Sequence, residues 1–178
     1  MRINGGHLKG RSFYPPANKW PTRPTTDISR EGLFNILQNI LDFESIHMLD
    51  LFGGTGAHSY EMISRGCPKT IYVDSFKPAA DFVRKTATSF GISNQIEIHI
   101  KDYKNFIKHT LLAFDYIFAG PPYPLPGIDQ IPDIILGKNL LKSGGLFVLE
   151  HNQEHDFSKH ARNTQVRKYG ETIFSFFQ

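Results

Sequence analysis

The 178-residue sequence contains a single cysteine, Cys67, so it cannot form an intramolecular disulfide. Disulfides are rare in the reducing cytosol, and a lone cysteine fits that compartment. No apolar run approaches the roughly 18 residues that a membrane-spanning helix needs, and the first residues do not form the apolar core of an export signal. We therefore expect a cytoplasmic protein that does not enter a membrane.

The sequence also lacks the patterns of metal and nucleophile chemistry. Eight histidines are present, but none stands at metal-ligand spacing beside a cysteine cluster. No Ser-His-Asp or Cys-His arrangement stands out, and there are no internal repeats. We expect no metal site and no covalent nucleophile.

Size and composition are those of an ordinary globular protein, with 40% hydrophobic and 21% charged residues. We expect one domain, in which residues 1–26 form a basic N-terminal hairpin or flap and residues 27–178 form the core. We also expect a monomer. Six basic and two acidic residues between Met1 and Glu31 give that segment a charge of +4. It is either a solvated arm or a surface that contacts phosphates.

Strand and helix patterns alternate along the core. Helices are expected over about 27–41 and 57–65, from Pro78 onward, and over 128–140, and parallel strands over 48–52, 70–73, 96–100, 114–119 and 146–150. Two further strands, 164–168 and 172–177, flank a glycine turn and predict an antiparallel hairpin. The predicted fold is α/β, with the mostly parallel sheet and C-terminal hairpin of the class I S-adenosylmethionine-dependent methyltransferase (Rossmann-like) fold, although the pattern fits other doubly wound folds too.

A glycine-rich turn and three acidic residues follow the first three strands. Ligands of open parallel sheets bind at the carboxyl ends of the strands. There Asp50 is placed to meet a cationic amino group, Asp74 a ribose diol and Asp102 an adenine amine, which together outline S-adenosylmethionine. The candidate cofactor-binding residues are Asp50, Phe52, Gly53, Gly54, Thr55, Gly56, Asp74, Ser75, Asp102 and Tyr103.

Other interpretations of these residues stay open. Each aspartate could be only a helix cap or a turn residue. The glycine loop could instead serve a nicotinamide dinucleotide, although Ser59 stands where the G-x-G-x-x-G pattern has its third glycine.

Short motifs spread over nearly the whole chain carry a more specific likeness. They are Met1-Arg2-Ile3, Gly5-Gly6, Lys9-Gly10-Arg11, Arg23-Pro24-Thr25-Thr26-Asp27, Arg30-Glu31, Leu33-Phe34-Asn35, Asp50-Leu51-Phe52, Gly54-Thr55-Gly56, Ser64-Arg65-Gly66, Pro121-Pro122-Tyr123, Tyr169-Gly170 and Ser175-Phe176-Phe177. With these motifs the sequence resembles the RsmD-type methyltransferases of bacterial small-subunit (16S) ribosomal RNA.

The resemblance implies methyl transfer from S-adenosylmethionine to the exocyclic N2 of one guanine. The implied partner is small-subunit ribosomal RNA or the assembling small-subunit particle. The candidate RNA-contacting residues are Arg11, Arg23, Thr25 and Arg30. Gly53 stands where the family usually has alanine, and its small size should be tolerated.

The catalytic loop departs from the family pattern. The implied catalytic residues are Gly120, Pro121, Pro122 and Tyr123, but the family has aspartate where this chain has Gly120. In the family that carboxylate and the first proline's carbonyl accept the two amine hydrogens, and the aromatic ring stacks on the base. Losing one such bond costs about 10²–10³ in rate. No nearby residue clearly replaces it, and whether Asp129 or Asp133 folds back is open.

Three functions are therefore compatible with the sequence. The leading hypothesis is an RNA methyltransferase, slowed by Gly120. The second is a methyltransferase-like RNA-binding protein that no longer catalyses. The third is a nicotinamide-dependent oxidoreductase that uses the glycine loop.

Overall fold

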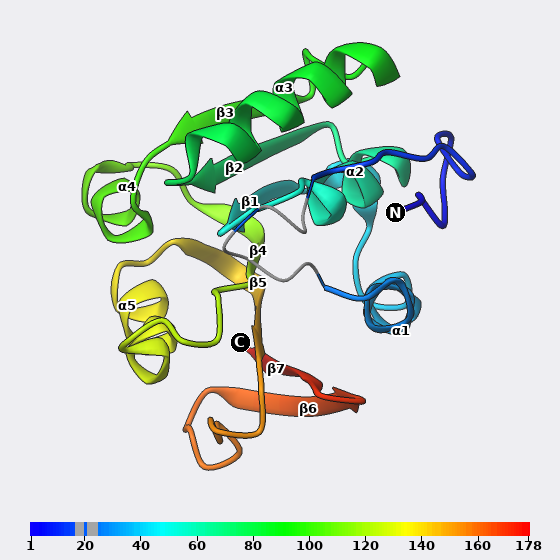
Figure 1. Ribbon diagram of the computed structural model, residues 1–178. Coiled ribbons are helices and arrows are strands. Elements are labelled where there is room, and N and C mark those ends of the chain that lie inside the picture. Colours follow the sequence, from blue (N-terminus) through cyan, green and yellow to red (C-terminus); the bar gives the residue numbers. More distant parts are fainter. Residues whose placement is uncertain (17–19, 21–24) are drawn as a thin grey trace.

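The structure is a computed structural model that describes residues 1–16, 20 and 25–178. Its centre is a seven-stranded sheet in the order β3-β2-β1-β4-β5-β7-β6 (Figure 1). The strands are β1 (His47–Leu51), β2 (Lys69–Asp74), β3 (Ile96–Ile100), β4 (Phe114–Ala119), β5 (Leu141–His151), β6 (Asn163–Tyr169) and β7 (Thr172–Phe177). The first five run parallel, and β7 pairs antiparallel with both β5 and β6. The predicted α/β methyltransferase fold with its closing hairpin is confirmed.

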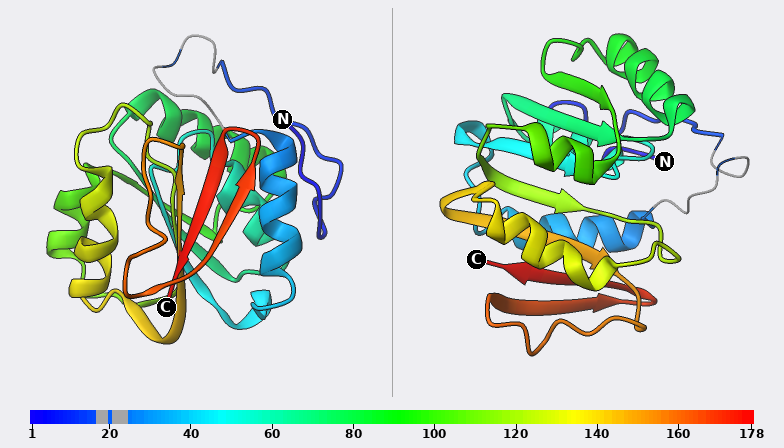
Figure 2. Two further views of the ribbon diagram at one scale, coloured as in Figure 1. Left: turned by 90° about the horizontal axis from the view of Figure 1, so that it is seen from below. Right: turned by 90° about the vertical axis from the view of Figure 1, so that its left-hand side faces the viewer.

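Helices cover both faces of this sheet (Figure 2). They are α1 (Asp27–Leu37), α2 (Ala57–Ser64), α3 (Lys77–Phe90), α4 (Tyr103–His109) and α5 (Ile131–Gly137), with short 3-10 turns at Phe43–Ser45 and Ile128–Gln130. Helices α4 and α5 pack on one face against β1 residues such as Leu49. Helices α1, α2 and α3 pack on the other, where Tyr72, Phe118 and Phe174 point. Alternate residues of each strand thus enter separate cores, as the pleat of a strand requires.

The local sequence explains where the helices begin. The side chain of Thr26 accepts a hydrogen bond from Ser29 N and caps α1, as a threonine at this position prefers. Pro78 lies in the first turn of α3, where its missing N–H costs nothing. Asp102 caps α4, a helix that the sequence analysis does not predict.

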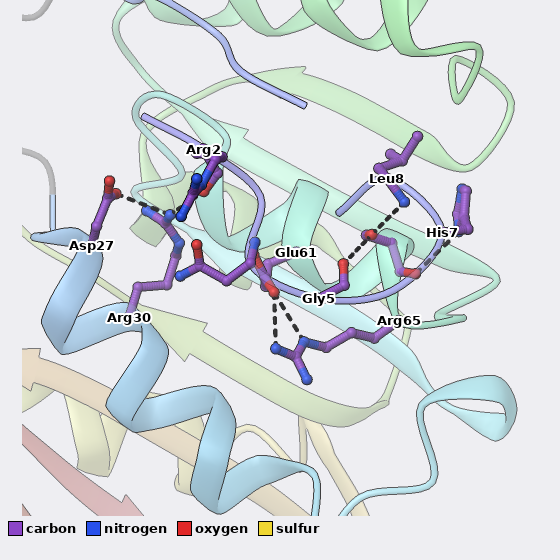
Figure 3. A network of polar contacts seen from close by, with 10 residues as sticks. Arg2, Gly5, His7, Leu8, Asp27, Arg30, Glu61 and Arg65 are labelled. Carbon is purple, nitrogen blue, oxygen red and sulfur yellow. Dashed lines mark hydrogen bonds and ion pairs between the residues drawn. The ribbon is translucent and has the colours of Figure 1, made fainter. Parts of the chain in front are cut away.

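The N-terminal residues form a small hairpin. An antiparallel bridge joins Arg2 and Ser12, and Ile3 and Phe13 are buried against α2 and α3. The hairpin is fixed to the end of α2: Leu8 N donates to Ser64 Oγ at 2.9 Å, and Asn4 N donates to Glu61 Oε2 at 2.9 Å (Figure 3). Among the described residues, no helix is long and apolar enough to cross a membrane.

Candidate functional site

A cavity of about 620 Å³ opens at the carboxyl ends of the parallel strands, where ligands of such sheets bind. Its volume lies in the range of small-molecule sites. It gathers most of the residues predicted from the sequence: Thr25, Arg30, Asp50, Phe52, Gly53, Gly54, Thr55, Asp74, Ser75, Asp102, Tyr103, Gly120, Pro121, Pro122 and Tyr123. Gly56 and Arg11 are not part of its lining, and Arg23 lies outside the described residues.

The glycine turn after β1 holds an unusual backbone. Phe52, Gly54 and Gly56 all have positive φ angles, of 58°, 51° and 77°. For the two glycines this conformation costs little, but for Phe52 it is strained. The Phe52 ring lies 4.6 Å from that of Tyr103, centroid to centroid. Phe52, from the turn after β1, and Tyr103, from α4, thus form an aromatic pair in the lining of the cavity.

Gly53 leaves room for a particular neighbour, Tyr72. A Cβ atom at position 53 would lie 2.3 Å from two ring carbons of Tyr72, which is fully buried. That ring is held in place because its hydroxyl donates to the carbonyl of Gly54 at 2.8 Å. A residue larger than glycine at position 53 would therefore have to displace the Tyr72 ring.

Asp50 is a buried carboxylate with one unsatisfied oxygen. Ser59 Oγ donates to its Oδ2 at 2.5 Å, whereas its Oδ1 is buried without a hydrogen-bond partner among the described residues. Burial raises the pKa of Asp50 from 3.8 to about 7, and the negative charge of Asp74 adds to this rise. A cationic group entering the cavity would find an oriented acceptor.

Asp74 and Asp102 organise the backbone around the cavity. The two carboxylate oxygens of Asp74 accept from Gly54 N and Phe76 N, each at 2.8 Å. Burial raises the pKa of Asp74, and these backbone bonds oppose the rise. Asp102 Oδ1 accepts from Lys104 N and Asn105 N, so Asp102 also serves as the N-terminal cap of α4. Both side chains nevertheless line the cavity.

Arg30 is a buried cation on the α1 side of the cavity. Its Nη2 donates to Arg2 O at 2.6 Å and pairs with Asp27 at 3.0 Å (Figure 3). Its Nε and Nη1 are buried without a partner among the described residues. Beside it, His58 stacks on Phe118 with a 3.9 Å separation of ring centroids. Burial and the charge of Arg30 hold the pKa of His58 well below 6.5, so this histidine is neutral.

The Pro-Pro-Tyr loop leaves β4 beside the end of β5. Gly120 N donates to Leu51 O at 3.2 Å, which ties the start of the loop to β1. Tyr123 donates its hydroxyl to Glu150 Oε1 at 3.3 Å, and Thr25 Oγ1 donates to Glu150 Oε2 at 2.5 Å. Glu150 therefore lies in the cavity wall, held between the loop and the segment before α1.

Several residues of the cavity lining were not predicted from the sequence, and among the described ones Glu150 is the one carboxylate. It lies at the carboxyl end of a strand, as Asp50 and Asp74 do, and the same rule applied to β5 would have found it. Asp129 and Asp133, the two acids left open, pair elsewhere: they contact His155 and His160. Within the part of the chain that the structure describes, no group of three or more His, Cys, Asp or Glu residues could hold a metal ion.

Comparison with known proteins agrees with this geometry. The family model named Conserved hypothetical protein 95 matches residues 1–178. The chain belongs to this family. One relative is ribosomal RNA small subunit methyltransferase D of Buchnera aphidicola, with 30% identity over 89% of this chain and 79% of that protein. The RsmD-type assignment is confirmed, and with it the enzyme class, a methyltransferase.

Solved structures share the fold of this family member. A hypothetical protein of Thermus thermophilus superposes with a TM-score of 0.87 at 24% identity, covering 100% of this chain and 99% of that one. An RNA methyltransferase of Salinibacter ruber, solved with S-adenosyl-L-homocysteine, superposes with a TM-score of 0.68 at 14% identity over 87% and 92% of the two chains. The class I methyltransferase fold is thus common to all three.

Proposed function

We propose that this chain transfers a methyl group from S-adenosylmethionine to the exocyclic N2 of a guanine in small-subunit ribosomal RNA. The observation that carries the proposal is the shared cavity, in which the glycine turn and its acids face the Pro-Pro-Tyr loop. The relative from Buchnera aphidicola, which bears the name of such an enzyme, supports the choice of RNA.

The residues of the cavity fit the methyl donor. Oδ1 of Asp50, which has no partner among the described residues, is suited to the donor's cationic amino group, because a buried carboxylate is strongly stabilised by an opposite charge. Asp74 and Asp102 line the same cavity. We assign Asp74 to the ribose diol and Asp102 to the adenine amine of the donor. The apolar rings of Phe52 and Tyr103 are suited to the adenine face. When bound, the donor supplies an electrophilic methyl group.

The loop after β4 is suited to the acceptor base. The Tyr123 ring offers a stacking surface worth about 1–3 kcal/mol per base. The carbonyl of Pro121 can accept one amine hydrogen and turn the nitrogen lone pair toward the methyl group. Positioning of this kind contributes much of the rate of such reactions. On the α1 side, Nε and Nη1 of Arg30, which have no partner among the described residues, are suited to a phosphate of the same nucleotide.

Transfer of labelled methyl groups tests the proposal. The chain should label small-subunit particles that lack the modification, and it should not label fully methylated particles, which serve as the matched control. Naked small-subunit RNA, offered in parallel, shows which form of the substrate is used. Absence of label on every RNA substrate would contradict the proposal.

Gly120 favours a second candidate, an RNA-binding protein without turnover, because the family's carboxylate is missing from the loop. A chain of this second kind would bind S-adenosylmethionine and RNA as the proposed enzyme does. It is distinguished by the transfer assay alone: binding of both ligands without any label on the RNA would establish it.

A further inference from the structure

We propose that Glu150 is a catalytic residue, which accepts the amine hydrogen that the family's loop aspartate would accept. The inference rests on the proposed function and assigns a residue for its chemistry. It concerns a carboxylate that comes from β5 instead of the loop after β4.

The sheet places Glu150 next to the missing side chain. Strands β4 and β5 are parallel neighbours, and Ala119 pairs with Leu149. Gly120 and Glu150 are the next residues along the two strands, so they lie side by side at the carboxyl end of the sheet. A Cβ atom built on Gly120 would lie 3.8 Å from Glu150 Oε2 and 3.2 Å from the ring of Phe118. A carboxylate on residue 120 and that of Glu150 would thus enter the same part of the cavity.

Glu150 is also held in one orientation. Only 5% of the residue is exposed, and Thr25 and Tyr123 each donate a hydroxyl hydrogen bond to it. An acceptor fixed before the reaction stabilises developing positive charge without reorganising.

Tyr123 joins the two parts of the acceptor site. Its ring is the proposed stacking surface for the base, and its hydroxyl contacts Glu150 Oε1. A base stacked on this ring therefore lies beside the carboxylate. Asp50 is the other buried carboxylate nearby, but it bonds to Ser59 beneath the glycine turn and is assigned to the donor.

In the proposed step, the lone pair of the guanine N2 forms the new N–C bond. The electrons of the methyl C–S bond remain on sulfur, which becomes a neutral thioether. The nitrogen, now positively charged, releases one proton. Glu150 accepts that proton and passes it to water, which restores the carboxylate.

A double-mutant cycle with Gly120→Asp and Glu150→Gln tests the inference. The readout is the single-turnover rate of methyl transfer to unmodified small-subunit particles. Glu150→Gln should lower the rate about 10²–10³-fold and leave S-adenosylmethionine affinity within about twofold, since the donor site is intact. Adding Gly120→Asp should restore at least about tenfold, because a carboxylate returns to the same place. Glu154→Gln, an exposed neighbour, is the matched control and should change nothing.

Several outcomes overturn the inference. A Glu150→Gln rate within about threefold of the unchanged chain does so, as does a double variant no faster than Glu150→Gln alone. If Glu150→Gln does not fold, Tyr123→Phe removes only the orienting hydroxyl. The inference then requires a rate about 3–10-fold lower with unchanged donor affinity, and an unchanged rate contradicts it. If Gly120→Asp transfers methyl groups but the unchanged chain does not, the catalytic role of Glu150 is overturned, while the fold still supports methyl transfer. If neither transfers, the proposed function itself is overturned.

Discussion

At the scale of single residues, burial decides what the carboxylates of the cavity can do. Asp50 is fully buried, and one of its oxygens has no hydrogen-bond partner in the described part of the chain, while Asp74 is held by two backbone N–H groups. The first is suited to take up a charged ligand and the second to shape the loop that surrounds it. The same carboxylate chemistry thus serves two purposes, because the local hydrogen bonds differ.

Binding of S-adenosylmethionine should depend on the charge of Asp50. Because burial raises the pKa of Asp50 to about 7, its carboxylate becomes ionised as the pH rises toward that value. The affinity should therefore increase as the pH rises through that value, by up to about tenfold per pH unit. Calorimetric titration at several pH values measures this increase.

The variant Asp50→Asn is the control for that titration. It should lower the affinity about 10–100-fold above the pKa of Asp50, as expected for removal of a charged hydrogen bond, and remove most of the pH dependence. In the ligand-free protein, the raised pKa also means that stability falls as the pH rises from about 4 to 7. A variant with the original pH dependence would show that Asp50 is not the group that titrates.

The variant Gly53→Ala should destabilise the protein by about 1–3 kcal/mol, because its Cβ would overlap the buried Tyr72 ring. For a chain of this size that corresponds to a melting temperature lower by about 2–12 °C. Thermal unfolding measures the change. Gly137→Ala, at a helical glycine with open space around its Cβ, is the matched control and should not lower the melting temperature. Equal melting temperatures for both variants would refute this explanation of Gly53.

At the scale of elements, α1 and the segment before it supply Thr25, Arg30 and Leu33 to the wall of the cavity, and the N-terminal hairpin supports α1 from outside the lining. The hairpin is held by polar contacts with the end of α2, where Arg65 also pairs with Glu61 at 3.0 Å (Figure 3). Arg30 links α1 to the hairpin through Arg2 O. The position of this wall therefore depends on a few hydrogen bonds as well as on the apolar contacts of Ile3 and Phe13.

Removal of the Ser64 hydroxyl should loosen the hairpin locally. In Ser64→Ala the buried N–H of Leu8 loses its acceptor, which costs about 1–3 kcal/mol. Hydrogen exchange should become faster for the amides of residues 3–13, while the amides of β1 and β4 keep their protection. Ser93→Ala, at an exposed serine, is the control and should leave the pattern unchanged. Uniformly faster exchange over the whole chain would contradict a local role for Ser64.

The sequence predicted most elements but not their full extents. The strands were predicted because each is a short apolar run between turn segments. The helices differ more: α1 ends at Leu37 instead of Leu41, and the helix expected over 128–140 is a short 3-10 turn followed by α5. The contact of Glu150 with the Pro-Pro-Tyr loop could not be predicted in detail, because strand order and register bring the two together. The space around Gly53 is likewise a property of the packed core.

At the scale of the whole molecule, a single sheet joins the proposed donor side, around β1 and β2, to the proposed acceptor side, around β4 and β5. The cavity lies where these halves meet. The charge is uneven as well: the first 31 residues carry +4, while the chain as a whole carries +3. We expect RNA to approach along this basic segment.

Binding of RNA should weaken steeply with salt, because contacts with phosphates release counterions. Arg11 lies on the surface, donates to Ser89 O and covers the ring of Phe90. Arg11→Ala should reduce the slope of log K against log salt by about 0.7–0.9 for each phosphate that the arginine neutralises, and it should leave S-adenosylmethionine affinity unchanged. Lys159→Ala, between β5 and β6, is the control. An unchanged slope for Arg11→Ala would remove that residue from the RNA surface.

The identity of the methylated nucleoside tests the central claim most directly. Small-subunit particles lacking the modification are incubated with the chain and S-adenosylmethionine, and their RNA is digested to nucleosides and analysed by mass spectrometry. We predict one new species, N2-methylguanosine, made by the unchanged chain despite its glycine at position 120. Methylation of another base or another atom, or no new species at all, would contradict the proposed reaction.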